Sequence, residues 1–229
     1  MVEDDGKRTA PEEDEKKVLE VLCRNSVTAL VQLFTAATSP KIREKAVTVV
    51  CSLVAVRRFD KWMVEEGVLP PLIRLVESGT DLGKEKSALS LKRLSSSVST
   101  ARAIFGHGGV RPLAEVCAAA GDSVTQSTAA CTLKNVSVVP EVRQVLVKEV
   151  AIKLMIDLLD FAPLVGTKNH AAECLQNLTA GTDDIKRRVV SEGGVRSLLA
   201  FLDRQGPPRE PTVLAVRNVV QWALTNELV

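Results

Sequence analysis

The sequence has few of the residues on which catalysis, metal binding and ligand pockets depend. Its 229 residues contain two histidines and no tyrosine, and aromatic residues make up 3% of the chain. Histidine is the commonest acid–base catalyst and metal ligand, and aromatic rings line most small-molecule pockets. We therefore expect no enzyme, no metal site, no cofactor and no small-molecule substrate.

Charge of one sign is also scarce. The formal net charge is +2, whereas nucleic-acid-binding domains usually concentrate many more bases on one face. Proteins that bind single strands also stack bases on aromatic rings, of which this chain has few. Nucleic-acid binding along a basic superhelix is therefore the least favoured function.

No pair of cysteines has the spacing of a redox or zinc motif. The chain has five cysteines, an odd number, and each lies in an apolar stretch where a thiol behaves as a small hydrophobic side chain. They are Cys23, Cys51, Cys117, Cys131 and Cys174. The longest apolar-looking run, residues 47–56, is too short to cross a membrane. We expect no integral membrane segment and a location in the cytoplasm, the nucleus or both.

The start of the chain is acidic and poor in apolar residues. Residues 1–17 hold seven acidic residues against four basic ones, together with Gly6 and Pro11. Such a segment cannot bury enough apolar surface to offset the entropy lost on ordering. We expect a disordered acidic tail over residues 1–15 and a folded domain over residues 16–229.

An apolar segment recurs five times along the rest of the chain, with a leucine five residues after each start. The segments begin at Asn25, Gly67, Gly108, Glu149 and Gly193, at intervals of 42, 41, 41 and 44 residues. A short charged helix is expected before each start, as over residues 60–66, and it ends at glycine where glycine is present, because glycine accepts the left-handed conformation. A helix of about three turns should follow, as over residues 69–76.

The longest helix of each unit should come last, after a polar loop. The apolar spacing predicts these helices over residues 42–56, 84–96, 124–137, 168–179 and 212–224. Three short helices cannot bury all their apolar faces alone, so stacking of like units is favoured. The sequence predicts an all-α solenoid of about five three-helix repeats, starting near residues 16, 58, 99, 140 and 183.

Four segments of this pattern resemble the armadillo repeat. They are residues 65–75 (EEGVLPPLIRL), 191–199 (SEGGVRSLL), 128–137 (TAACTLKNVS) and 170–179 (HAAECLQNLT). The resemblance covers about residues 16–229 and is strongest to plant armadillo proteins, including the armadillo regions of plant U-box ubiquitin ligases. It implies a right-handed armadillo-type solenoid. HEAT repeats are the near alternative, but their units have two helices, and the charged helix before each glycine favours three.

The resemblance also implies a binding surface. In armadillo proteins the third helices line a concave groove, where an Asn near the end of each one binds the backbone of an extended peptide. The matching positions here are Asn135, Asn177 and Asn218, while the first two repeats hold Ser52 and Arg93. A carboxamide both donates and accepts, so it suits a peptide group. The alternative is that each Asn ties its own helix end to a neighbouring backbone.

Basic residues lie along the same helices. They are Lys45, Lys86, Lys92, Arg93, Lys134 and Arg217. If several face the groove, they would favour an acidic or phosphorylated peptide, whereas otherwise they form a solvated rim. The Trp positions of importin-type grooves hold other residues here, Glu173 among them, which disfavours a nuclear-import receptor. The candidate groove residues are Arg93, Lys134, Asn135, Glu173, Asn177, Arg217 and Asn218.

The expected function is that of a protein-interaction scaffold that binds an extended peptide segment of a partner protein. The alternative is the substrate-recognition part of a U-box ubiquitin ligase whose catalytic module lies outside this chain. Trp222, near the end of the last long helix, is expected to cover the core of the last repeat.

Overall fold

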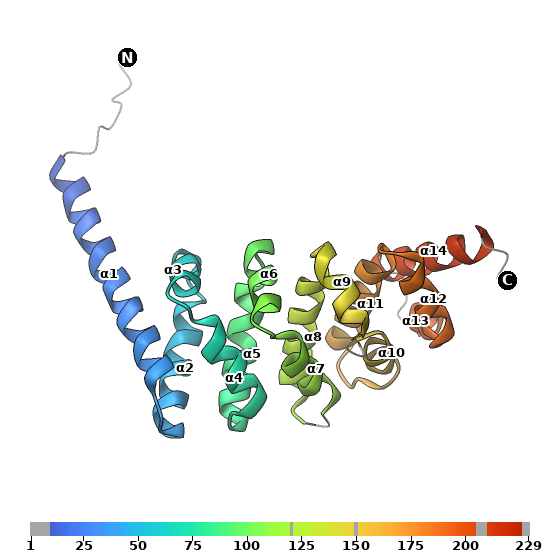
Figure 1. The fold of residues 1–229 in the computed structure, drawn as a ribbon, viewed down its shortest axis with the longest axis horizontal. Coiled ribbons are helices and arrows are strands. Elements are labelled where there is room, and N and C mark those ends of the chain that lie inside the picture. The colour runs from blue at the N-terminus through green and yellow to red at the C-terminus, as the bar shows by residue number, and fades with distance from the viewer. Residues whose placement is uncertain (1–9, 120, 149–150, 205–209, 226–229) are drawn as a thin grey trace, which may run out of the picture. The chain divides into compact units, whose positions relative to one another are not determined.

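The computed structural model describes residues 10–119, 121–148, 151–204 and 210–225. Within these ranges all regular secondary structure is helical (Figure 1), which confirms the predicted all-α class. The chain divides into two compact units, unit 1 (Met1–Val68) and unit 2 (Leu69–Val229), and each is described by itself.

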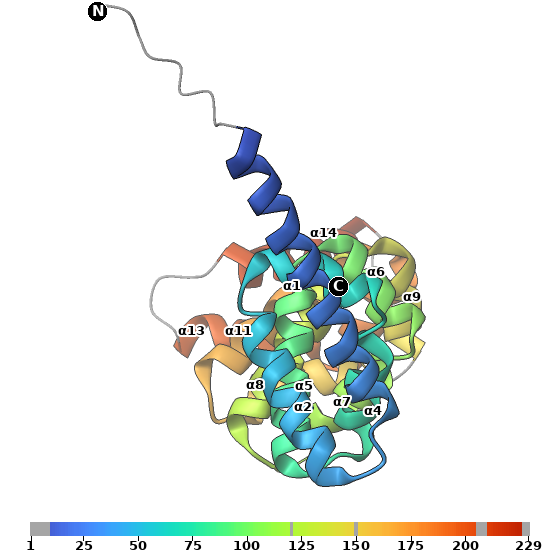
Figure 2. The same cartoon turned by 90° about the vertical axis from the view of Figure 1, so that its left-hand side faces the viewer.

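Unit 1 is built around one long helix. It contains α1 (Ala10–Ala36), α2 (Pro40–Leu53), the short 3-10 helix η1 (Arg57–Phe59) and α3 (Asp60–Glu65). The C-terminal half of α1 packs against α2 and α3, and it buries Val27, Val31 and Phe34. The N-terminal half extends past the rest of the unit (Figure 2). Four apolar side chains there are 57–62% exposed: Val18, Leu19, Val21 and Leu22.

Helix α1 corrects two expectations. It begins at Ala10, so residues 10–15 of the expected tail are helical, and residues 1–9 lie outside the described residues. Proline and acidic residues are favoured in the first turn of a helix, and this part of the sequence supplies both. The first repeat also lacks the expected break at Asn25, because no glycine stands there to end a helix. The first and second helices of this repeat therefore form one continuous helix, α1.

One stretch of α1 is long and apolar enough to span a membrane by length and composition alone. It runs from Lys17 to Ala36, with a mean hydropathy of 1.2 and 17% of the window buried. Core helices of soluble proteins and signal sequences meet the same criterion, so one such helix is weak evidence for a membrane segment. The run contains Glu20 and Arg24, which is why it did not stand out as an apolar stretch.

Unit 2 repeats the helix pattern predicted from the sequence. Its first helices are α6 (Val98–Gly106), α9 (Pro140–Lys148) and α12 (Asp183–Ser191). Its second helices are α4 (Leu69–Ser78), α7 (Val110–Ala118), α10 (Ala151–Phe161) and α13 (Gly194–Arg204). Its third helices are α5 (Asp81–Leu94), α8 (Ser123–Ser137), α11 (Val165–Thr179) and α14 (Glu210–Thr225).

The second and third helices of unit 2 form two layers. Each second helix contacts the next one, from α4 through α7 and α10 to α13, and the third helices do the same from α5 to α14. Each third helix also packs on the second helix before it. The core lies between the layers, and its fully buried side chains include Leu72, Leu91, Leu113, Leu133, Met155, Leu175, Leu198 and Val219.

The glycines at the repeat starts have the backbone conformation predicted for them. Gly67, Gly108 and Gly193 have φ angles of 83°, 75° and 82°, in the left-handed region that favours glycine. The residue after Gly193 is also constrained: a Cβ on Gly194 would lie 2.7 Å from Val189 Cγ1. Gly193 turns the chain, and Gly194 allows α12 and α13 to meet closely.

Two repeats have no glycine at the start, and in both the buried position lies one residue later than in the others. The leucine five residues after the start is fully buried at Leu72, Leu113 and Leu198. In the first and fourth repeats Leu30 and Leu154 are half-buried, and the following residues, Val31 and Met155, are buried instead. Without the left-handed glycine, the second helix enters the core one residue later.

The third helices begin one to three residues before their predicted starts, and for α5 and α8 a residue in the preceding loop caps the helix. Thr80 Oγ1 accepts a hydrogen bond from the Gly83 amide at 3.2 Å, so α5 begins at Asp81. Asp122 Oδ2 accepts from the Thr125 amide at 2.7 Å and begins α8 in the same way. These loops are polar in the sequence, and one polar side chain in each of them caps the helix that follows.

Candidate functional site

The third helices of unit 2 hold equivalent residues at regular intervals. Arg93, Asn135, Asn177 and Asn218 follow one another at 42, 42 and 41 residues. The first three lie near the C-terminal ends of α5, α8 and α11, and Asn218 lies in the middle of α14. Because consecutive third helices pack together, these residues form one row. We call the surface that carries this row the third-helix face. Of its predicted residues, Arg93, Lys134, Asn135, Glu173, Asn177 and Asn218 are half-buried and Arg217 is exposed.

Each asparagine of the row is joined to the third helix before its own. Its amide nitrogen Nδ2 donates to a hydroxyl oxygen: Asn135 to Ser95 at 2.9 Å, Asn177 to Ser137 at 2.9 Å and Asn218 to Thr179 at 3.4 Å. We call this series the asparagine–hydroxyl ladder. It joins α5, α8, α11 and α14 in succession.

The hydroxyls of the ladder are fixed by their own helices. Ser95 Oγ donates to Lys92 O at 2.8 Å, and Ser137 Oγ donates to Lys134 O at 2.6 Å. Thr179 Oγ1 donates in the same way to the carbonyl three residues before it, at 3.1 Å. Each hydroxyl therefore donates its proton along its own helix and accepts the asparagine N–H from the next one.

The ladder leaves part of each carboxamide unused. The Oδ1 atoms of Asn135, Asn177 and Asn218 accept no hydrogen bond from the residues that the structure describes. The alternative expected from the sequence, a hydrogen bond to a neighbouring backbone, is also present: Asn177 Nδ2 donates to Lys134 O at 3.4 Å. The structural bonds thus involve the N–H groups, while the carbonyl oxygens can accept from a ligand. Peptide binding by these residues stays a prediction.

Sequence reasoning did not identify the hydroxyls of the ladder. The signal was nevertheless present, because Ser95, Ser137 and Thr179 each stand two residues after a position of the row. A serine or threonine near a helix end usually bonds to its own backbone. Only the packing of consecutive third helices shows that it also accepts from the next repeat.

Charged groups meet at the centre of the third-helix face. Lys134 Nζ lies 3.2 Å from Glu173 Oε2, and these side chains are 22% and 33% exposed. Lys92 stands 42 residues before Lys134, at the equivalent position of α5. Both lysines act electrostatically on Cys131 of α8 and His170 of α11, so these side chains from three helices lie in one neighbourhood. The structure therefore brings the predicted Lys134 and Glu173 together.

Two of these groups are shifted by burial. Burial is the main cause that lowers the pKa of His170 below its ordinary 6.5, and Lys134 lowers it further, while Glu173 acts in the opposite direction. Burial raises the pKa of the Cys131 thiol, although Lys134 and Lys92 oppose the shift. Both groups are neutral near pH 7 and add no charge to this surface. Sequence reasoning did not place His170 on this face.

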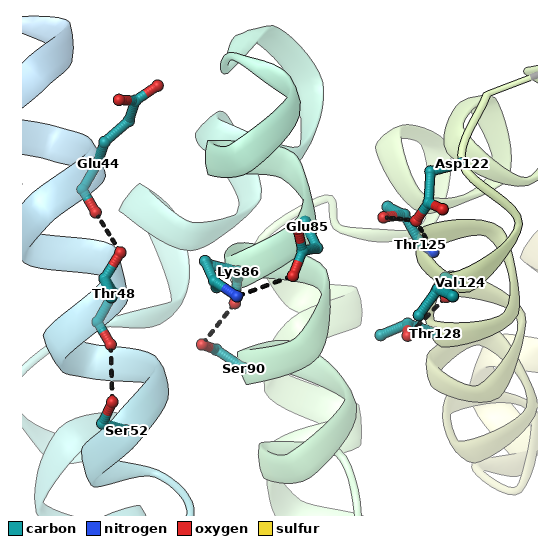
Figure 3. A network of polar contacts seen from close by, with 10 residues as sticks. All are labelled: Glu44, Thr48, Ser52, Glu85, Lys86, Ser90, Asp122, Val124, Thr125 and Thr128. Carbon is teal, nitrogen blue, oxygen red and sulfur yellow. Dashed lines mark hydrogen bonds and ion pairs between the residues drawn. The ribbon is translucent and has the colours of Figure 1, made fainter.

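Other hydroxyls of the third helices bond within their own helix. Thr48 Oγ1 donates to Glu44 O at 2.7 Å in α2, and Ser90 Oγ donates to Lys86 O at 2.8 Å in α5 (Figure 3). Ser52, the equivalent of the asparagines in the first repeat, bonds to Thr48 O at 3.1 Å. Lys86 pairs with Glu85 at 2.8 Å.

A pocket lies beside Asn218 at the C-terminal end of the face. Its volume is about 530 Å³, and Thr179, Asp183, Gln221 and Trp222 are among its lining residues. Trp222 is 6% exposed, in keeping with the expected role in the last repeat. A hydrogen bond from Lys186 lowers the pKa of the Asp183 carboxyl below its ordinary value. No group of three metal-ligating side chains occurs among the described residues.

The fold matches that of known armadillo proteins. A designed armadillo repeat protein, YIII(Dq)4CqI, is 18% identical, with a TM-score of 0.76 over 89% of this chain and 86% of that one. A second design, in complex with the peptide (KR)4, is 17% identical, with a TM-score of 0.73 over 90% and 85% of the two chains.

Another similar structure comes from work on a phosphorylation switch that controls the interaction between cadherin and beta-catenin. It is 15% identical to this chain. Its TM-score is 0.79 over 87% of this chain and 40% of that one. No protein-family model matches the sequence, and no curated protein matches it. These likenesses confirm the predicted fold and do not show the similarity to plant U-box ligases. The chain thus has the fold of an armadillo-type solenoid.

Proposed function

We propose that this protein is a non-enzymatic interaction scaffold that binds an extended peptide segment of a partner along the third-helix face. The observation that carries the proposal is the row of asparagine Oδ1 atoms on α8, α11 and α14, which accept no hydrogen bond from the described residues. Proteins of similar fold support it, since one holds a (KR)4 peptide and another concerns the interaction between cadherin and beta-catenin.

The chemistry of the row suits a peptide backbone. An extended peptide outside a sheet presents N–H and C=O groups that need partners. The Oδ1 atoms of Asn135, Asn177 and Asn218 can accept from such N–H groups whatever side chains the peptide carries. Because the asparagines are about one repeat apart, they would hold the peptide at widely spaced points.

The charges of the face support an acidic peptide. Lys92, Arg93, Lys134 and Arg217 lie on or beside the row, against Glu173 and, in the pocket beside Asn218, Asp183. Carboxylate and phosphate groups form strong charge-assisted hydrogen bonds with such side chains. This preference is opposite to that of the designed protein that holds the basic (KR)4 peptide.

Location and wider role are also part of the proposal. The five cysteines are free, and four of them are buried, as suits a protein of the cytoplasm or nucleus. The role as substrate-recognition part of a U-box ligase remains a prediction from the resemblance alone. Nucleic-acid binding remains the least favoured function.

Peptide binding along the row can be tested with a synthetic peptide of alternating Glu and Ser residues. Its binding is measured by fluorescence anisotropy to the intact protein and to Asn135→Ala/Asn177→Ala. Loss of two hydrogen bonds of about 1 kcal/mol each should weaken binding by roughly tenfold or more. The control is Asn25→Ala, an exposed asparagine of α1. Equal affinity of the double variant and the control would reject the proposed surface.

A further inference from the structure

The ion pair between Lys134 and Glu173 is unusual for its burial. A second pair between helices of unit 2, Arg102 with Glu141, is longer, at 3.4 Å, and its side chains are 55% and 66% exposed. The Lys134–Glu173 pair is 3.2 Å long and only 22% and 33% exposed. Exposed pairs contribute little to stability, whereas a charge left without its partner becomes more costly as burial increases.

Lys92 has no such partner. It forms no ion pair with any residue that the structure describes, although it lies close enough to His170 and Cys131 to lower the pKa of both. Lys134 acts on the same two side chains, as does Glu173. Two ammonium groups and one carboxylate therefore share one patch, in which His170 is neutral near pH 7. The patch has one positive charge in excess.

We propose that Lys92 and Lys134 together receive an acidic side chain of the bound peptide, and that Glu173 covers Lys134 in the free protein. This inference rests on the proposed function and names the chemistry and the place of one contact within it. The ligand is a carboxylate on a peptide, seated beside Asn135 where α5, α8 and α11 meet.

The exchange of partners at Lys134 explains how this site opens. The Glu173 side chain is one-third exposed, so it can turn into solvent when another carboxylate arrives. Lys134 then exchanges one ion pair for another, which changes the free energy little. The gain comes from Lys92, which acquires a partner that it lacks in the free protein. Glu173 thus competes with the ligand and limits its affinity.

The test uses two labelled peptides, one of alternating Glu and Ser and one of alternating Gln and Ser. Binding of both is measured by fluorescence anisotropy to the intact protein and to its Glu173→Gln, Lys92→Gln and Lys134→Gln variants. Glu173→Gln should tighten binding of the acidic peptide about threefold or more, because Lys134 is then uncovered. Each lysine variant should weaken that binding, and none of the three should change binding of the Gln peptide.

The matched control is Glu115→Gln, which removes the same charge from α7. Glu115 pairs with Arg111 at 3.0 Å, and it does not belong to the third helices. Equal effects of Glu173→Gln and Glu115→Gln, or weaker binding by Glu173→Gln, would overturn the inference. If Asn135→Ala/Asn177→Ala still weakens binding of either peptide in that case, the proposed function stands without it. If no variant binds either peptide, both fail.

Discussion

Asn177 and Ser137 join two successive repeats through one short hydrogen bond, 2.9 Å from Nδ2 to Oγ. Ser137 Oγ in turn donates to Lys134 O, at 2.6 Å, so the bond reaches the backbone of α8. In a repeat protein, stability depends on the contacts between neighbouring units as well as on each unit. The ladder therefore adds directional polar bonds to the interfaces between successive third helices.

We predict that Asn177→Ala lowers the free energy of unfolding by about 1 kcal/mol, because it removes a half-buried hydrogen bond. Ser137→Ala should have a similar effect, and the double variant should lose less than the sum of the two. Urea unfolding of all three variants gives the coupling energy. Gln176→Ala, a neighbouring change outside the ladder, is the control. Strict additivity of the two single changes would show that the bond contributes nothing.

Protonation of His170 should reduce stability. Burial lowers its pKa in the folded protein below its ordinary 6.5, so the unfolded chain binds a proton more readily. The stabilisation is complete above the unfolded pKa and is lost as the pH falls below it. The free energy of unfolding, measured by urea titration, should therefore decrease from about pH 7 to about pH 5.

The control for this pH dependence is His170→Gln, which should show a flatter profile over the same range. The pKa values of Asp122 and Asp183 lie below their ordinary 3.8, so their protonation acts only at lower pH. An identical slope in the variant and the unaltered protein would exclude His170 as its source.

Alanine at Gly193 should destabilise the protein through its backbone alone. The φ angle is 82°, and a Cβ there would meet no atom within 4 Å. A left-handed residue other than glycine costs about 1–2 kcal/mol, and asparagine tolerates that conformation better. Thermal unfolding should rank the residues at this position as Gly, then Asn, then Ala. Gly106→Ala, in open space with no positive φ, should not destabilise, and equal losses at both positions would contradict this account.

The repeat was readable from the sequence because local rules determine most of it. Glycine at 67, 108 and 193 set three helix ends and the register of the leucines that follow. Where glycine is absent, at Asn25 and Glu149, the buried residue lies one position later, at Val31 and Met155. The helix starts after Thr80 and Asp122 were predicted three residues and one residue too late, because caps are single side chains within polar loops.

The candidate site was readable only in part. The asparagine positions follow from the repeat interval, and so does their row. The pairing of Lys134 with Glu173 depends on how α8 packs against α11, and no local pattern links residues 39 positions apart. The position of His170 among lysines from two other helices depends on the same packing.

The asparagine–hydroxyl ladder also bears on how fast and how tightly a ligand can bind. Its bonds hold the carboxamides of Asn135 and Asn177 in place before any partner arrives. A surface that is already ordered loses little side-chain entropy on association. The third-helix face is therefore preorganised, and docking at the row should require no rearrangement of the helices that carry it.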